Sequence, residues 1–230
     1  MPAHLGLIAA VRDRLRDAAD PVRAASMRRR VRSELPFHGV SAAVRRRLFA
    51  EVFATCPLED FETWEDTVHT LWRVASHREE RYAAVELADD PRYAGYRVPG
   101  AVPLYEGLIT AGAWWDYVDP LAVRGIGPLL RAHPRELRPR IGDWSLSGDR
   151  WLRRAAVLCQ LRAGEETDRA LLFDSVDANL GHPDPFVHRA AGRALREYAR
   201  TDPDSVAAFA AQHRERAARP ALREVLRRLG

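Results

Sequence analysis

Two tryptophans, a tyrosine and two carboxylates fall within one seven-residue window, AWWDYVD at residues 113–119. If the window is helical, Trp115 and Asp119 are four residues apart and lie on one face, whereas Trp114 and Val118 lie on another. An exposed ring beside a carboxylate suits a flat or apolar ligand that carries positive charge, because the ring face attracts cations. The carboxylate adds a Coulomb attraction that grows where water is excluded.

Both residues of this pair also have a purely structural interpretation. Helices often bury tryptophan, and Asp119 precedes Pro120, where it can end or kink a helix through local hydrogen bonds. Neither interpretation explains why Trp115 and Asp119 share a face opposite Trp114. The remaining tryptophans are expected in the core: Trp64, Trp72, Trp144 and Trp151.

Arginine stripes are the second chemical feature of the chain. In the segment 186–200 the arginines fall at i, i+4, i+7 and i+11 on one helical face: Arg189, Arg193, Arg196 and Arg200. A largely opposed apolar face is expected from Phe186, Ala190, Ala191, Ala194, Leu195 and Tyr198. In the segment 150–158 Trp151 should face inward, and three arginines should project: Arg150, Arg153 and Arg154. A further basic cluster, 28–32, contains Arg30. Charge runs are usually solvated faces, but several on consecutive inner helices would form a channel that neutralises phosphates.

Spacing connects the first feature with the second. Arg154 follows Asp119 by 35 residues, and Arg193 follows Arg154 by 39. In a chain of stacked helix pairs, such spacing returns to equivalent positions on neighbouring repeats. The three side chains are therefore expected to line one patch of a concave face.

The elements that must position these residues are helices. Strand-like alternation is absent, and proline and glycine breakers leave segments of about 10–18 residues with apolar residues at i, i+3, i+4 and i+7. Roughly a dozen helices joined by short loops favour stacked helix pairs. We predict an all-α, single-domain solenoid of HEAT-like repeats over residues 1–230, with a concave basic groove.

Composition excludes several classes of protein. Hydrophobic residues make up 47% and charged residues 30%, which indicates a globular rather than a disordered chain. No apolar run approaches the ~20 residues of a bilayer span, and the apolar segment 5–11 continues into RDRLRD rather than a cleavage site. Cys56 and Cys159 are expected as buried free thiols in a reducing cytoplasm. Metal and nucleotide motifs are absent, so we predict no metal and no cofactor.

The basic residues are all of one type. All 36 are arginine, and the net charge is +4. Chemistry that needs a lysine amine, such as a Schiff base, is therefore unavailable except through the N-terminus.

Five segments together resemble one known family, the AlkD family of HEAT-like-repeat DNA alkylation-repair glycosylases. They occur in the family's order and cover most of the chain: MRRRVRSELPFHGV (27–40), LWRVASHREERYAAVEL (71–87), WWDYVD (114–119), WLRRAAVLCQL (151–161) and RAAGRALREYAR (189–200).

The resemblance implies roles for individual residues. Carried over by position, the family's catalytic aromatic falls on Trp115, its catalytic acid on Asp119 and its catalytic arginine on Arg154. The family's second pocket tryptophan falls on Arg193, and an aromatic of its early basic helix falls on Arg30. The arginine stripes and this resemblance together predict the DNA-binding arginines Arg30, Arg153, Arg189, Arg193, Arg196 and Arg200, of which Arg30 and Arg193 stand where the family has aromatic residues.

The resemblance also implies a reaction. A monofunctional glycosylase of this kind hydrolyses the N-glycosidic bond of cationic N3- or N7-alkylated purines in duplex DNA, without flipping the base into a pocket. Asp119 would steady the oxocarbenium-like sugar and orient water. Arg193 would weaken recognition of small methylated purines. Three alternatives follow for it: it grips a phosphate, it leaves room for a bulky adduct, or the protein has lost catalysis. The expected partner is double-stranded DNA containing alkylated bases; the expected protein is a cytoplasmic, nucleoid-associated monomer without a membrane partner.

Two other functions fit the same residues. One is a non-catalytic HEAT-like-repeat protein that binds damaged or distorted DNA, with salt-dependent affinity that survives loss of the Asp119 charge. The other is a protein-binding solenoid whose arginine stripes meet an acidic partner.

Overall fold

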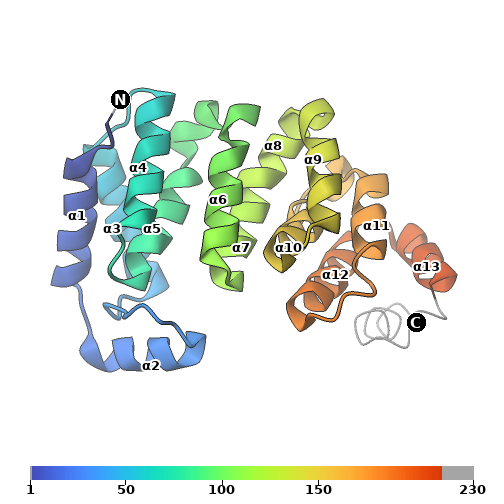
Figure 1. Ribbon diagram of the computed structural model, residues 1–230, viewed down its shortest axis with the longest axis horizontal. Helices are drawn as coiled ribbons and strands as arrows, with labels where there is room; N and C mark the ends of the chain where they lie inside the picture. The colour runs from blue at the N-terminus through green and yellow to red at the C-terminus, as the bar shows by residue number, and fades with distance from the viewer. Residues whose placement is uncertain (1, 214–230) are drawn as a thin grey trace. The chain divides into compact units, whose positions relative to one another are not determined.

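The computed structural model describes residues 2–213, in which every regular element is helical (Figure 1). The chain divides into two compact units, the first ending at Arg97 and the second beginning at Val98. The predicted all-α class is confirmed, and thirteen α-helices in the described residues agree with the expected dozen. The single domain over residues 1–230 and its concave groove stay predictions.

Four helices form the core of the first unit, and a fifth lies beside them. The bounds are α1 Leu5–Asp17, α2 Pro21–Val31, α3 Ala42–Thr55, α4 Phe61–Arg73 and α5 Arg78–Ala88, followed by a 3-10 turn, Pro91–Tyr96. Helix α4 packs on α5, and α1 packs on both α3 and α5. Trp64, which is fully buried, donates its ring N–H to the carbonyl of Leu87 at 3.3 Å. Trp72 is also buried, as the sequence predicts.

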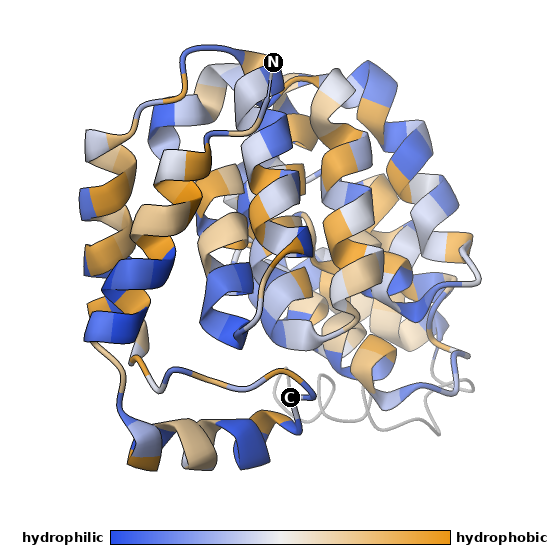
Figure 2. Cartoon of the chain, turned by 60° about the vertical axis from the view of Figure 1, so that its left-hand side comes forward, coloured by the Kyte–Doolittle hydropathy of each residue, from blue (hydrophilic) through white to orange (hydrophobic). Residues whose placement is uncertain are grey.

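Helix α2 lies apart from that bundle (Figure 1) and has no buried residue. It carries both hydrophilic and hydrophobic residues (Figure 2). The chain returns from it through a loop that the buried Glu79 carboxylate holds by accepting the backbone N–H groups of His38, Gly39 and Val40. A side chain at Gly39 would meet the carbonyl oxygen of Asp20 at 2.1 Å, so only glycine fits there.

The second unit holds the remaining helices in sequence. The bounds are α6 Val102–Gly112, α7 Trp115–Pro120, a π-helical segment Leu121–Ile126, α8 Gly127–Ala132, α9 Pro134–Leu146, α10 Arg150–Leu158, α11 Arg169–Asp177, α12 Pro185–Tyr198 and α13 Pro203–Gln212, with 3-10 turns at Pro99–Ala101 and Gly164–Glu166. Helix α10 is central, because it packs against α6, α7, α9, α11 and α12. Trp144 and Trp151 are buried here, as predicted.

Helix α7 continues through Pro120 into the π-helical segment and then into α8. Two glycines let this continuous stretch approach its neighbours. A side chain at Gly125 would lie 2.2 Å from the Tyr105 ring, and one at Gly127 would lie 2.3 Å from the Cys159 carbonyl oxygen. Cys159 is itself fully buried, which raises the pKa of its thiol to about 12.

Three sequence expectations can be settled from this fold. Cys56 and Cys159 are both free thiols, but only Cys159 is buried, because Cys56 caps the exposed end of α3. The apolar face predicted for 186–200 is confirmed by the buried residues of α12, which include Ala190, Ala194 and Leu195. Among residues 2–213, no helix combines the length and apolar character that a bilayer crossing needs.

Candidate functional site

Asp119 lies at the meeting point of three helices of the second unit. Its Oδ1 accepts the Arg154 Nε–H at 2.7 Å, and its Oδ2 accepts from Arg154 Nη2 at 2.8 Å. Arg193 Nη1 donates to the same Oδ2, also at 2.8 Å. Helices α7, α10 and α12 thus bring together the three residues that the sequence spacing predicts in one patch.

Arg154 differs from the sequence expectation. It was expected to project from α10, but its side chain is only 8% exposed. The expectation is wrong because helical periodicity takes no account of a counter-ion: the Asp119 carboxylate draws the guanidinium inward, where a buried charge needs such a partner. The third nitrogen, Nη1, donates to the carbonyl of Phe186 at 2.5 Å. Arg154 therefore ties α7 and the first turn of α12 to α10.

The two tryptophans of the window point to different surroundings. Ala113 has a left-handed backbone (φ 42°), and Trp114 is extended at the N-cap of α7. The Trp114 ring packs with Trp151 and Phe186, with centroids 6.2 and 5.6 Å away. Trp115 begins the helix and is 43% exposed. The window thus supplies one anchored ring and one free ring, the arrangement expected from the four-residue spacing of Trp115 and Asp119.

The remaining predicted DNA-binding arginines are distributed unevenly. Arg189, Arg193 and Arg200 are exposed on α12 or just after it, and Arg196 is partly buried. Arg153 instead closes the end of α9: it donates to the carbonyls of Ser145, Leu146 and Ser147 and to the Asn179 side chain. Arg30 is exposed on α2, in the first unit. Contact with DNA stays a prediction for all six.

One supporting pair was missed in the sequence. Arg150 Nη1 donates to Asp184 Oδ2 at 2.7 Å, while Asp184 Oδ1 caps α12 by accepting the Phe186 N–H, also at 2.7 Å. Burial alone would raise the pKa of Asp184, but these hydrogen bonds and the Arg150 charge lower it. The signal was present, because an aspartate directly before a proline is a common start of a helix. The pair fixes the start of the helix that carries Arg193.

Comparison with known proteins identifies the family of the chain. The family model for the DNA alkylation repair enzyme matches residues 11–229. The chain belongs to the DNA alkylation repair enzyme family. A solved structure described as a "predicted DNA alkylation repair enzyme from Enterococcus faecalis" superposes with a TM-score of 0.77 at 23% sequence identity, covering 90% of this chain and 94% of that one. At that identity the likeness shows the fold alone. No curated protein matches the chain significantly.

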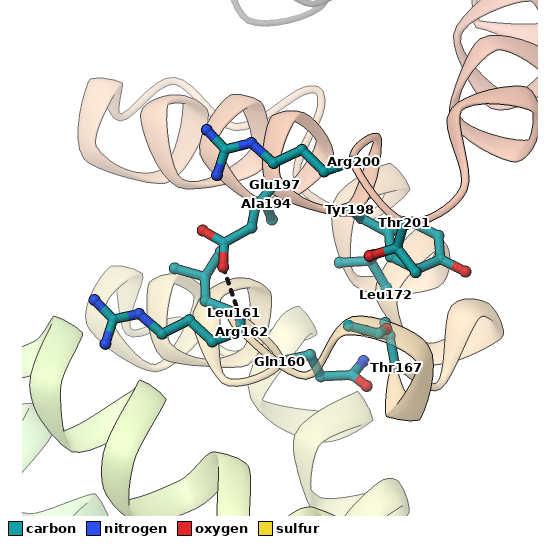
Figure 3. A pocket seen from close by; sticks show the side chains of 11 residues that line it. Gln160, Leu161, Arg162, Thr167, Leu172, Ala194, Glu197, Tyr198, Arg200 and Thr201 are labelled. Carbon is teal, nitrogen blue, oxygen red and sulfur yellow. Dashed lines mark hydrogen bonds between the residues drawn. The ribbon is translucent and has the colours of Figure 1, made fainter.

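This alkylation repair family member also has a cleft of about 220 Å³ beyond the Asp119 cluster. It lies between the end of α10 and the end of α12 (Figure 3). Figure 3 shows Arg162 and Arg200 reaching to the same side, with the Glu197 carboxylate between them. Glu197 accepts the backbone N–H of Arg162 at 2.7 Å. The cleft thus carries two positive charges and one negative charge, and Glu197 fixes the loop at Arg162.

A further ionisable cluster of the repair protein lies in its first unit. Ligand-type atoms of His38, His77 and Glu80 lie within 4.8 Å of one another, and the two rings stack at 3.7 Å. Glu80 accepts from Arg12 Nε at 2.9 Å and from the Ser76 hydroxyl at 2.8 Å. Burial alone would raise the pKa of Glu80, but the His38 imidazole and these two donors outweigh it and lower the pKa to about 2. Glu80 is therefore a fixed anion that joins α1 to α5.

Proposed function

We propose that this repair-family protein is a monofunctional DNA glycosylase that hydrolyses the N-glycosidic bond of cationic N3- or N7-alkylated purines in duplex DNA. The observation that carries the proposal is the Asp119 carboxylate, which Arg154 holds through two hydrogen bonds. Asp119 lies on the same short helix as the exposed Trp115. Family membership supports a role in the repair of alkylated DNA. The glycosylase reaction, the lesion and the absence of base flipping are proposed from the resemblance to the AlkD family, and the arrangement of Trp115, Asp119 and Arg154 is consistent with them.

The reaction begins with a base that already carries positive charge. Cleavage of the bond between C1′ and the base nitrogen gives the bonding electron pair to the base, which leaves neutral, while positive charge develops on the deoxyribose. Asp119 faces that charge and orients the water that adds to C1′, whose proton is then released to solvent. Because the stabilising carboxylate is fixed in advance by Arg154, little reorganisation accompanies the reaction.

The other residues would bind the duplex. Trp115 presents an exposed ring to the lesion's sugar and backbone, and Arg189 and Arg200 present charge to flanking phosphates. The chain has no lysine to form a Schiff base, so the product would be an abasic site with an intact strand. Arg193, in place of an aromatic wall, favours a bulky adduct over a methyl group. We place this activity in the cytoplasm, at the nucleoid, in a monomeric protein.

The test is mass spectrometry of the bases released from alkylated duplex. Wild-type protein should release free 7-methylguanine or a larger N3 or N7 adduct, and Asp119→Asn should reduce the rate about 100-fold or more. Asp143→Asn, an exposed carboxylate on α9, is the matched control and should retain full activity. Arg193→Trp should raise the rate on methylated duplex relative to bulky adducts. If wild-type protein releases no modified base from either duplex, the proposal is wrong.

One observation favours a second function. The Asp119 carboxylate already has two guanidinium partners, so the site has a surplus of positive charge, as a DNA-binding surface does. A non-catalytic protein that recognises distorted duplex would bind in a salt-dependent manner and would release no base. Asp119→Asn would then bind duplex at least as tightly as wild type.

A further inference from the structure

We infer that Arg193 is an exchangeable counter-ion of Asp119, which leaves the carboxylate for a DNA phosphate when duplex binds. The inference rests on the proposed function and deepens it, because it assigns to Arg193 the step that opens Asp119 to the cationic sugar. Arg193 is in this sense a positioning residue that acts through Asp119.

The two arginines at Asp119 are held in very different ways. Arg154 makes a bidentate pair, is 8% exposed and has its third nitrogen on the Phe186 carbonyl. Arg193 makes one hydrogen bond through a terminal nitrogen, and its side chain is 44% exposed. An exposed ion pair of this kind contributes at most about 1 kcal/mol, whereas breaking a buried pair costs several times more. Arg193 is therefore the partner that can leave.

The charges around Asp119 require that Arg193 leave the carboxylate. With both guanidinium groups in place, one negative charge faces two positive charges. A sugar that becomes cationic beside this cluster is repelled by Arg193 at the same oxygen that should stabilise it. Removing Arg193 from the cluster leaves Asp119 balanced by Arg154 alone, and the developing charge on the sugar then takes the vacated place.

A DNA phosphate beside α12 would compete with Asp119 for Arg193. Arg189 lies one turn earlier on α12 and is exposed, and like charges four residues apart on a helix repel each other. A backbone phosphate beside that helix relieves this repulsion and offers Arg193 bidentate hydrogen bonds, compared with the single bond that it makes to Asp119. Binding of duplex and opening of Asp119 are thereby coupled.

The first test measures binding to undamaged duplex, so it does not depend on catalysis. In fluorescence anisotropy titrations across salt, Arg193→Ala should reduce the slope of log K against log salt by about 0.9, the share of one phosphate. Arg193→Lys should restore most of that slope. Arg138→Ala is the matched control, because Arg138 is also half-exposed and pairs with one aspartate, Asp168, at 2.9 Å; its slope should equal that of wild type.

The second test is a double-mutant cycle between Asp119 and Arg193. Asp119→Asn removes the competitor for Arg193 and should tighten binding to undamaged duplex about two- to five-fold more in the wild-type background than in the Arg193→Ala background. With lesion duplex at saturation, Arg193→Ala should weaken binding yet raise the single-turnover rate, because Asp119 starts open. Circular dichroism confirms that each variant is folded.

The outcomes separate this inference from the proposed function. An unchanged salt slope in Arg193→Ala, or no coupling in the cycle, overturns the exchange whether or not base is released. A reduced slope with clear coupling supports the exchange, even if wild-type protein releases no base and the glycosylase proposal is overturned. A lower single-turnover rate in Arg193→Ala at saturating duplex overturns the inference that Arg193 must leave.

Discussion

Trp114 and Trp115 are neighbours in the chain, yet the first ring belongs to a partly buried aromatic cluster and the second is 43% exposed. The division arises at the backbone. Trp114 is extended at the N-cap, and Trp115 is the first residue of α7. The anchored ring fixes the start of the helix, and that start determines where the free ring and Asp119 stand. One dipeptide thus joins the aromatic packing to the candidate site.

This division predicts opposite effects for the two tryptophans. Trp114→Ala should lower the free energy of unfolding by about 3 kcal/mol, because it removes a ring packed against Trp151 and Phe186. Trp115→Ala should change it by less than about 0.5 kcal/mol, as is usual for exposed positions, while reducing base release at least about 10-fold. Urea denaturation and base-release assays measure the two quantities. Equal destabilisation by both variants would contradict the observed orientation.

The same comparison applies to the two arginines at Asp119. Arg154→Met should lower the free energy of unfolding by about 3 kcal/mol, because the buried carboxylate loses its bidentate partner and the Phe186 carbonyl loses its donor. Arg193→Met should lower it by less than about 1 kcal/mol, since that contact is exposed. Urea denaturation of the two variants side by side gives the difference. Equal losses would show that Arg193 is as firmly held as Arg154.

Close packing at the start of α8 gives a third prediction. Gly127→Ala should destabilise the protein by about 2 kcal/mol, because the added carbon would meet the Cys159 carbonyl oxygen at 2.3 Å and backbone would have to move. Gly142→Ala is the control. That glycine lies within α9 with nothing within 4 Å of an added carbon, so alanine should stabilise by about 0.5–1 kcal/mol. Thermal unfolding of the pair should show melting temperatures displaced in opposite directions.

These features differ in how far the sequence could predict them. Periodicity correctly predicted that Trp151 and Leu195 face the core, and the spacing of Asp119, Arg154 and Arg193 correctly predicted one patch. Periodicity failed at Arg154, because it assigns a helix face without knowing that a carboxylate lies on the buried side.

The backbone of the site was the other part that the sequence could not predict. The left-handed Ala113 carries no compositional signal, because alanine rarely adopts positive φ. The π-helical segment after Pro120 also has no signal in the sequence, and the close approach of Gly125 to Tyr105 and of Gly127 to Cys159 is visible only in the folded protein. The Glu80 cluster was missed because His38 and His77 are far apart in the sequence.

Glu80 predicts the behaviour of the protein in acid. Its pKa is lowered from the ordinary 4.5 to about 2, so the folded state binds this proton less readily than the unfolded chain. The contribution of the Glu80 carboxylate to the free energy of unfolding, up to about 3 kcal/mol, is therefore complete above pH 4.5 and disappears as the pH falls toward 2. Glu80→Gln should lower stability at pH 7 and flatten its decline between pH 5 and about 2. Urea denaturation across pH, with the exposed Glu59→Gln as the charge-matched control, measures both.

The burial of Cys159 has a consequence for a member of a family that repairs alkylated DNA. Agents that alkylate purines are electrophiles, and a thiolate is the protein group that they attack most readily. Because burial raises the pKa of the Cys159 thiol to about 12, Cys159 stays protonated at neutral pH and resists alkylation by such agents. Iodoacetamide at pH 8 should label only Cys56 in the folded protein and both cysteines in urea, which peptide mass spectrometry would detect.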